Sequence, residues 1–225
     1  MNDRVLVIAA HSDDETLGCG GTILRHVAVG DEVHWVICTR TFFPAWPADV
    51  IERKNAEIMQ VWDAYKCVAP HRLTFPTGTL ERQSLDNMIE ELRDVIEAVR
   101  PAVVYAVSDQ DVHTDHAVIW RALSVVLKPM HMGAKYGVQK ILAYETPSST
   151  DQAPPSASRA FFPQVYHDIT GHLERKLEIL ALYASEAQPE PMPRSPSAVR
   201  AWARIRGATV GVEYAEAFTL VREIE

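Results

Sequence analysis

The sequence contains few cysteines, no long hydrophobic run and an excess of acidic residues. Its three cysteines are odd in number and form no CxxC pair, so we expect reduced thiols and a cytoplasmic location. No apolar stretch approaches the roughly 20 residues of a transmembrane helix, and the first residues lack the basic region and cleavage site of a signal peptide. A formal net charge of −8 argues against a nucleic-acid partner.

The rest of the composition is that of an ordinary globular protein. Hydrophobic residues make up 47% of the 225 residues, and charged residues make up 23%. This length suits one large α/β domain better than two small ones. We therefore expect a single domain over residues 1–225.

Apolar runs rich in β-branched residues alternate with helix-like stretches along most of the chain. This alternation is typical of an α/β fold with a mostly parallel sheet and helices on both faces. The expected strands are 5–10, 32–39, 72–75, 102–107, 140–145, 164–169 and 216–222. The expected helices are 16–29, 50–67, 84–99, 115–127, 170–185 and 197–205. Two proline-rich segments, 146–163 and 188–196, are expected to be surface loops or linkers.

Two clusters of polar side chains follow predicted strands. The segment from His11 to Glu15 follows the first strand, and the segment from His113 to His116 follows the strand at 102–107. Ligands bind at the carboxyl ends of parallel strands, near the point where strand order reverses. We therefore expect the clusters to meet, and a divalent cation would offset the cost of crowding their carboxylates together.

Two imidazoles and one carboxylate with an open position are a common arrangement for catalytic zinc. His11, Asp14 and His116 would supply these ligands. Asp13 would then be the general base for a water molecule whose pKa the metal lowers. His113, three residues before His116, would donate a proton or stabilise an oxyanion. Asp115 would orient a histidine as a hydrogen-bond acceptor.

Each motif taken alone also has a simpler interpretation. Asp13 could be only the N-cap of the following helix. His113 and His116 could be surface or capping residues. The glycines at 18–21 could serve close helix–strand packing or cradle a phosphate, although they lack the P-loop Lys-Ser/Thr and the dinucleotide-binding spacing.

The two motifs resemble those of the LmbE-like, or PIG-L, zinc-dependent N-deacetylases. Members carry His-Pro-Asp-Asp-Glu after the first strand and His-x-Asp-His after a later one, and Ser12 is the one departure in the first motif. The resemblance continues through nearly the whole chain, at residues 16–22, Arg53 with Glu57, 176–183 and 214–218. It implies a Rossmann-like three-layer sandwich.

The resemblance also implies the roles of the site residues. The metal ligands would be His11, Asp14 and His116, with one Zn²⁺ per chain or, alternatively, Fe²⁺. Asp13 would be the general base, and His113 would stabilise the oxyanion or protonate the leaving amine. Glu15 would support the turn, binding backbone amides near the helix start. Asp115 keeps the role expected from its position, which is to orient a histidine ligand.

The implied reaction is removal of an N-acetyl group from a GlcNAc-type amino sugar or its conjugate, giving a free amine and acetate. The partner would be this small molecule, and family habit favours a homo-oligomer. An amidase acting on another small N-acyl compound and a non-catalytic metal-containing binding protein stay open as alternatives. A phosphoester hydrolase would usually need two metal ions.

Substrate contacts are expected from the loop at 40–47 and from the second predicted helix. Phe43 and Trp46 could stack on a sugar face, and Arg40 and Arg53 are available to an anionic group such as phosphate. Arg53 corresponds to a substrate-contacting arginine in the resemblance, but could equally be a solvated helix charge. The loop could equally be a hydrophobic lid or a subunit contact, and the segment at 146–163 could form another wall of the pocket.

Overall fold

The protein folds around one seven-stranded sheet. The computed structural model describes residues 2–68, 70–154, 156 and 160–225. The strand order is β3-β2-β1-β4-β5-β7-β6, in which β7 runs antiparallel to both of its neighbours and the other pairs are parallel. The strands are β1 (Arg4–Ala9), β2 (Glu32–Arg40), β3 (His71–Pro76), β4 (Val103–Val107), β5 (Lys140–Tyr144), β6 (Val165–Asp168) and β7 (Ala215–Glu223).

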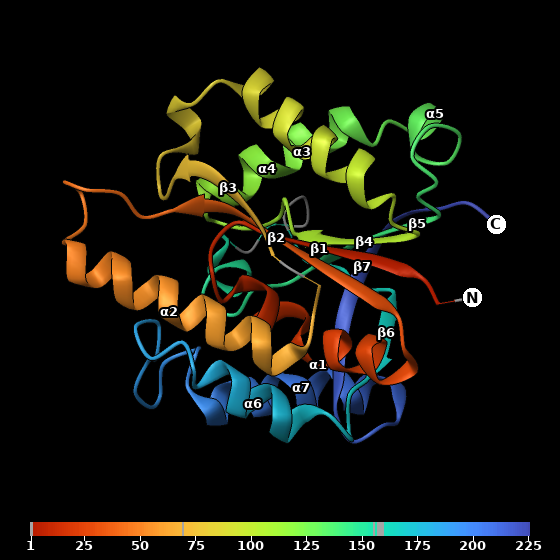
Figure 1. Cartoon of the computed structure of the whole chain (residues 1–225). Coiled ribbons are helices and arrows are strands. Elements are labelled where there is room, and N and C mark those ends of the chain that lie inside the picture. Colours follow the sequence, from red (N-terminus) through yellow and green to blue (C-terminus); the bar gives the residue numbers. More distant parts are fainter. Residues whose placement is uncertain (1, 69, 155, 157–159) are drawn as a thin grey trace.

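Helices cover both faces of this sheet, so the fold has three layers (Figure 1). The helices α3, α4 and α5 lie on one face, and α1, α2, α6 and α7 lie on the other. Their bounds are α1 (Asp14–Val29), α2 (Ala48–Tyr65), α3 (Leu85–Val99), α4 (Thr114–Val126), α5 (Pro129–Met132), α6 (Leu173–Leu180) and α7 (Pro196–Val210). Across the described residues, no helix combines the length and the apolar character needed to cross a membrane.

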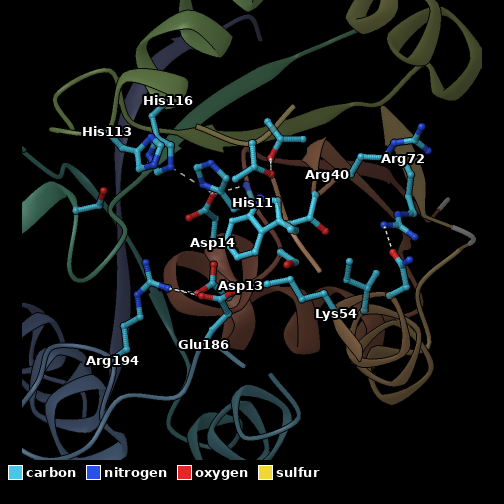
Figure 2. A pocket seen from close by; sticks show the side chains of 18 residues that line it. His11, Asp13, Asp14, Arg40, Lys54, Arg72, His113, His116, Glu186 and Arg194 are labelled. Carbon is cyan, nitrogen blue, oxygen red and sulfur yellow. Dashed lines mark hydrogen bonds and ion pairs between the residues drawn. The ribbon is translucent and has the colours of Figure 1, made fainter. Parts of the chain in front are cut away.

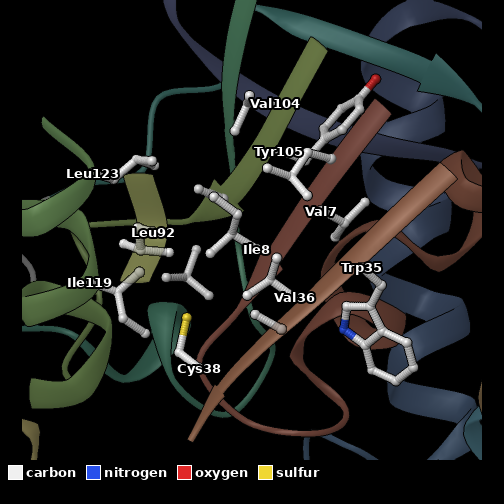
Figure 3. Close-up of a cluster of buried hydrophobic side chains, with 14 of the residues drawn as sticks. Val7, Ile8, Trp35, Val36, Cys38, Leu92, Val104, Tyr105, Ile119 and Leu123 are labelled. Carbon is white, nitrogen blue, oxygen red and sulfur yellow. The ribbon is translucent and has the colours of Figure 1, made fainter. Parts of the chain in front are cut away.

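The central strands are buried on both faces, as expected for parallel strands between helical layers. Successive side chains of β1 point to opposite faces. Val7 lies in register with Trp35 on one face, and Ile8 occupies the other face (Figure 3). Buried side chains of α3 and α4 complete the core on the side of Ile8: Leu92, Ile119 and Leu123.

The sequence-based prediction of an α/β fold with a mostly parallel sheet is confirmed. Most element bounds differ from the expected ones by only a few residues. The helix expected at 170–185 is shorter at both ends and runs from Leu173 to Leu180. It begins late because Thr170 donates both its N–H and its hydroxyl to the Asp168 carboxylate, which holds the chain in a turn before α6. At the other extreme, α7 continues five residues beyond its expected end, as far as Val210.

The strand order reverses direction at β1. This strand pairs with β2 on one side and with β4 on the other, so Val7 lies opposite both Trp35 and Tyr105. The chain leaves β1 and β4 at adjacent carboxyl ends. The segments at 10–15 and 108–116 therefore emerge side by side at the switch point, where ligands bind in such sheets.

Candidate metal and catalytic site

The two polar segments form one cluster at the carboxyl edge of the sheet (Figure 2). One ring nitrogen from each of His11, His113 and His116 lies within 4.8 Å of the other two. The Oδ2 atom of Asp14 lies 3.5 Å from Nδ1 of His11 and 3.3 Å from Nε2 of His116. The structure thus brings together the three residues predicted as ligands, together with His113.

Asp14 is the first residue of α1 and is fixed by the backbone. Its Oδ2 accepts the N–H of His11 at 2.8 Å. Burial alone would raise the pKa of Asp14, but His116 and His11 hold that pKa well below its usual value. Asp14 is therefore an ionised carboxylate directed at two imidazoles.

His116 has one nitrogen that is paired and one that is not. Its Nδ1 lies 3.0 Å from Oδ2 of Asp111. The Asp111 carboxylate also accepts the hydroxyl of Ser149 at Oδ1 and that of Thr150 at Oδ2. Its Nε2 is buried and has no hydrogen-bond partner among the described residues. An orphaned buried nitrogen facing a carboxylate is the arrangement expected of a metal ligand whose other nitrogen is held by an acid.

Carboxylates surround both candidate imidazole ligands. Burial lowers the pKa of His116, but Asp14 and Asp111 outweigh this effect and raise the pKa to about 10. His11 likewise has a pKa of about 9, because bonds with Asp115 and Asp14 outweigh its burial. The same carboxylates that raise the pKa of these imidazoles would also stabilise a divalent cation bound between them.

Asp115 orients His11. Its Oδ2 lies 2.9 Å from Nε2 of His11, and its two oxygens also accept the N–H groups of Gly78 and Leu80. Since Nε2 of His11 is engaged in this bond, Nδ1 is the nitrogen turned toward Asp14. A carboxylate bonded to the far nitrogen of an imidazole fixes the orientation of the ring, and the role of Asp115 toward a metal ligand stays a prediction.

His113 has a different hydrogen-bond arrangement. Its Nδ1 accepts the backbone N–H of Asp115 at 3.2 Å, so in the neutral ring the proton resides on Nε2. Burial and the neighbouring His11 and His116 lower the pKa of His113, which favours this neutral form. His113 is thereby suited to donate a hydrogen bond into the site.

The donor set fits a single divalent metal. Two imidazole nitrogens and one carboxylate oxygen converge from His11, Asp14 and His116, and the three imidazoles form a second possible set. Nitrogen and oxygen donors of this kind suit zinc and also iron(II). Nδ1 of His113 accepts a backbone N–H and its Nε2 carries the proton, so this ring offers no free lone pair to a metal. The set that contains Asp14 is therefore favoured.

Asp13 lies beside this cluster, and its side chain points to Arg194 and not to the histidines. It occupies the N-cap position of α1 with φ of 117°, an uncommon value for a residue other than glycine, and its side chain makes no capping bond. Its carboxylate accepts a hydrogen bond from Arg194, from the proline-rich segment at 188–196. Burial raises the pKa of Asp13 well above its ordinary value, although Arg194 opposes this shift. The simple N-cap interpretation therefore does not describe what this side chain does.

Glu15 is completely buried and supports the turn before α1. It accepts hydrogen bonds from the N–H of Asp13 and from the hydroxyls of Thr16 and Tyr183. Burial raises the pKa of Glu15 to about 7. These contacts match the expected structural role, and Tyr183 ties the turn to the segment after α6.

The glycines of α1 allow close packing. A Cβ atom on Gly18 would lie 2.1 Å from the Tyr144 ring, and one on Gly21 would lie 2.7 Å from the Ile169 side chain. The packing interpretation of this run is therefore the one that the structure supports. Cys19 has non-helical φ and ψ values and divides α1 into two helical parts.

The second part of α1 is capped by a buried ion pair. Glu216 accepts the N–H groups of Gly21 at 2.8 Å and Thr22 at 2.7 Å, and lies 2.7 Å from Nζ of Lys176. Lys176 also donates to the carbonyl of Leu17. This cluster joins α1, α6 and β7 behind the site.

A cavity of about 200 Å³ opens onto the histidine cluster. Arg40 and Trp46 line it, as expected from the sequence, and Ser149 contributes from the segment at 146–163. Phe43 is 78% exposed and Arg53 is also exposed, and neither belongs to the lining. The loop at 40–47 is therefore only partly a cavity wall.

Four charged lining residues were not predicted from the sequence. They are Lys54, Arg72, Glu186 and Arg194. Lys54 precedes the buried Ile58 by one helical turn and so shares its face, a signal that could have favoured Lys54 over Arg53. Nothing in the local sequence around Arg72 or Arg194 marks them as cavity residues.

Comparison with known proteins identifies relatives of this arrangement. The family model described as PIG-L, GlcNAc-PI de-N-acetylase, matches residues 6–127, more than half of the chain. The uncharacterized deacetylase YaiS of Escherichia coli is 28% identical over 170 residues, which cover 73% of this chain and 81% of YaiS.

Two solved structures share the fold. The N,N'-diacetylchitobiose deacetylase of Pyrococcus horikoshii gives a TM-score of 0.76 at 20% identity and covers 97% of this chain and 84% of its own. The 4-carboxy-2-hydroxymuconate hydratase GalB of Pseudomonas putida gives 0.74 at 20% identity, with coverage of 100% and 98%.

A deacetylase and a hydratase share this fold, so the fold alone does not select a reaction. The family match is more specific. It contains both polar motifs, from His11 to Glu15 and from His113 to His116. The chain belongs to the PIG-L family of de-N-acetylases.

Proposed function

We propose that the protein is a metal-dependent hydrolase that removes an N-acetyl group from a GlcNAc-type amino sugar or its conjugate. The observation that carries the proposal is the buried Nε2 of His116, which has no hydrogen-bond partner among the described residues and lies 3.3 Å from the Asp14 carboxylate. A second carboxylate, Asp13, stays outside the donor set. A site that only stored a metal would have no need of this second buried acid.

The residues that would hold the metal are His11, Asp14 and His116. A bound divalent ion supplies a Lewis acid and lowers the pKa of water toward neutrality. Asp111 and Asp115 fix the two imidazoles through their other nitrogens, so that the donor atoms need little rearrangement.

Asp13 is the proposed general base. Its raised pKa brings it closer to the range in which a carboxylate accepts a proton from water and returns it to a leaving amine. Arg194 holds this carboxylate in place. His113 would donate its Nε2 proton as a hydrogen bond to the oxyanion that forms when water adds to the acetamide carbonyl.

The experiment is acetate release from a panel of N-acetylated sugars. We expect turnover of at least one GlcNAc-type compound by the zinc-loaded protein, loss of turnover after chelation, and recovery when zinc is restored. Turnover restricted to non-sugar N-acyl compounds would favour the amidase alternative. Absence of acetate from every compound, with zinc bound, would overturn the proposal.

Three expectations from the sequence stay predictions. They are a single domain, a cytoplasmic location and a homo-oligomeric state. Light scattering of the purified chain would test the assembly directly.

A further inference from the structure

The two ends of the site cavity have opposite chemistry (Figure 2). Imidazoles and the Asp14 carboxylate form one end, where the acetamide would be hydrolysed. Arg40 and Arg72 line the other end of the same cavity. The second end has no role in the reaction proposed above.

The cations of the cavity are not equally neutralised. Arg194 pairs with Asp13 and Glu186, and Lys54 pairs with Glu186. In the described ranges 2–68, 70–154, 156 and 160–225, Arg40 and Arg72 have no carboxylate within ion-pair distance. A chain with a formal net charge of −8 thus keeps two uncompensated guanidinium groups at one end of its cavity.

Neutral groups hold both arginines in position. Arg72 donates to Oδ1 of Asn55 at 2.7 Å, and the guanidinium of Arg40 lies 4.2 Å from the centre of the Phe42 ring. Burial, followed by the charge of Arg40, lowers the pKa of Arg72. Holding two like charges in this way costs free energy, and an anion bound between them would remove that cost.

Guanidinium groups have donors to spare for such an anion. Each carries five N–H donors in a fixed plane that matches phosphate and carboxylate oxygens. Arg72 uses one of its terminal nitrogens on Asn55, and its remaining N–H donors have no carboxylate partner among the described residues.

We propose that Arg40 and Arg72 form an anion subsite, so that the preferred substrate is an N-acetylated amino sugar bearing a phosphate ester or a carboxylate. This inference rests on the proposed function and specifies its substrate class. The acetamide lies at the histidine end while the anionic group contacts the two arginines. A neutral sugar would leave both guanidiniums uncompensated.

Kinetics on matched substrates tests this subsite. The probes are N-acetylglucosamine, its 1-phosphate, its 6-phosphate and N-acetylmuramic acid, which separates a carboxylate from a phosphate. We expect kcat/KM for at least one anionic compound to exceed that for the neutral sugar by about tenfold or more, equivalent to about 1.4 kcal/mol. Equal values for all four compounds would overturn the inference.

The arginine variants assign the preference to this end of the cavity. Arg40→Gln and Arg72→Gln should each reduce the anionic-to-neutral ratio of kcat/KM severalfold. Arg121→Gln, an exposed position of α4 outside the cavity, removes the same charge and should keep the ratio. Arg40 is itself exposed, so Arg40→Gln keeps the test valid if Arg72→Gln does not fold. An unchanged ratio in Arg40→Gln would contradict the assignment.

Binding of inorganic phosphate separates this inference from the proposed function. Calorimetry on the chelated protein should show millimolar binding that weakens in Arg40→Gln. If phosphate binds in this way but no compound releases acetate, the proposed hydrolase function fails while the subsite stands. If neutral sugars are hydrolysed and phosphate does not bind, the subsite fails while the function stands.

Discussion

The two halves of α1 each face a buried cluster of charged groups. The clusters differ in whether each buried polar atom has a hydrogen-bond partner, and we call a cluster complete when it does. Behind the helix, Glu216 and Lys176 satisfy one another and the backbone of α1. In front of the helix, Asp14 and His116 lie 3.3 Å apart, and Nε2 of His116 has no hydrogen-bond partner in the part of the chain that the structure describes. A complete cluster stabilises the fold, whereas an incomplete buried cluster indicates a ligand that the protein is built to bind.

The largest effect on stability is expected at the complete cluster. Lys176→Met leaves the Glu216 carboxylate buried without its cation and should lower the free energy of unfolding by about 3–5 kcal/mol. Chemical denaturation measures this change. The double variant Lys176→Met/Glu216→Gln should recover part of the loss, because no buried charge is then left alone. A single variant as stable as the parent would show that the ion pair does not hold α1 in place.

At the incomplete cluster, the expected effect is on turnover. His113→Gln should lower kcat by about 10²–10³-fold, the usual cost of removing one oxyanion donor, with zinc content unchanged. Metal analysis accompanies the kinetics. If zinc is lost with His113, the three-imidazole set holds the metal and Asp14 has another role.

A smaller effect is expected from the acid that holds His116. Asp111→Asn should weaken zinc affinity by about 10–100-fold, because the imidazole loses its charged partner. Asp109→Asn, at an exposed position two residues earlier, provides the matched control and should bind zinc like the parent. Zinc affinities are measured by competition with a chelator. Equal affinities for both variants would show that Asp111 does not support zinc binding by His116.

The effect that is smallest at neutral pH is expected at His167, on the complete side of α1. Burial and the nearby cation Arg25 lower the pKa of His167 to about 3, and its Nδ1 lies 3.3 Å from the Thr22 hydroxyl. The unfolded chain binds a proton here below about pH 6.5 and the folded chain does not, so stability should fall as pH drops from 6.5 toward 3.

His167→Gln should flatten this slope, which is at most about 1.4 kcal/mol per pH unit for one group. Denaturation curves at several pH values compare the variant with the parent. The same slope in both proteins would show that His167 is not the responsible group.

The helices, the strands and the histidine cluster could be predicted from the sequence. The elements follow from local patterns, and the cluster follows from two local motifs placed at the ends of neighbouring strands. Apolar periodicity marks strands and helices, and topology requires that the ends of β1 and β4 be adjacent. The cavity lining depends instead on where long side chains point. Arg53 and Lys54 differ by about 100° around one helix, and Arg194 reaches Asp13 from a segment 181 residues away. No local pattern carries that information.

The roles of Asp13 and Asp14 are tested most directly by measuring bound zinc and acetate release on Asp13→Asn and the parent protein together. We expect about one zinc per chain in both proteins and a kcat lowered by about 10²–10⁴-fold in the variant, the range expected for loss of a general base. Loss of zinc from Asp13→Asn, or turnover equal to that of the parent, would contradict the division of labour between Asp13 and Asp14.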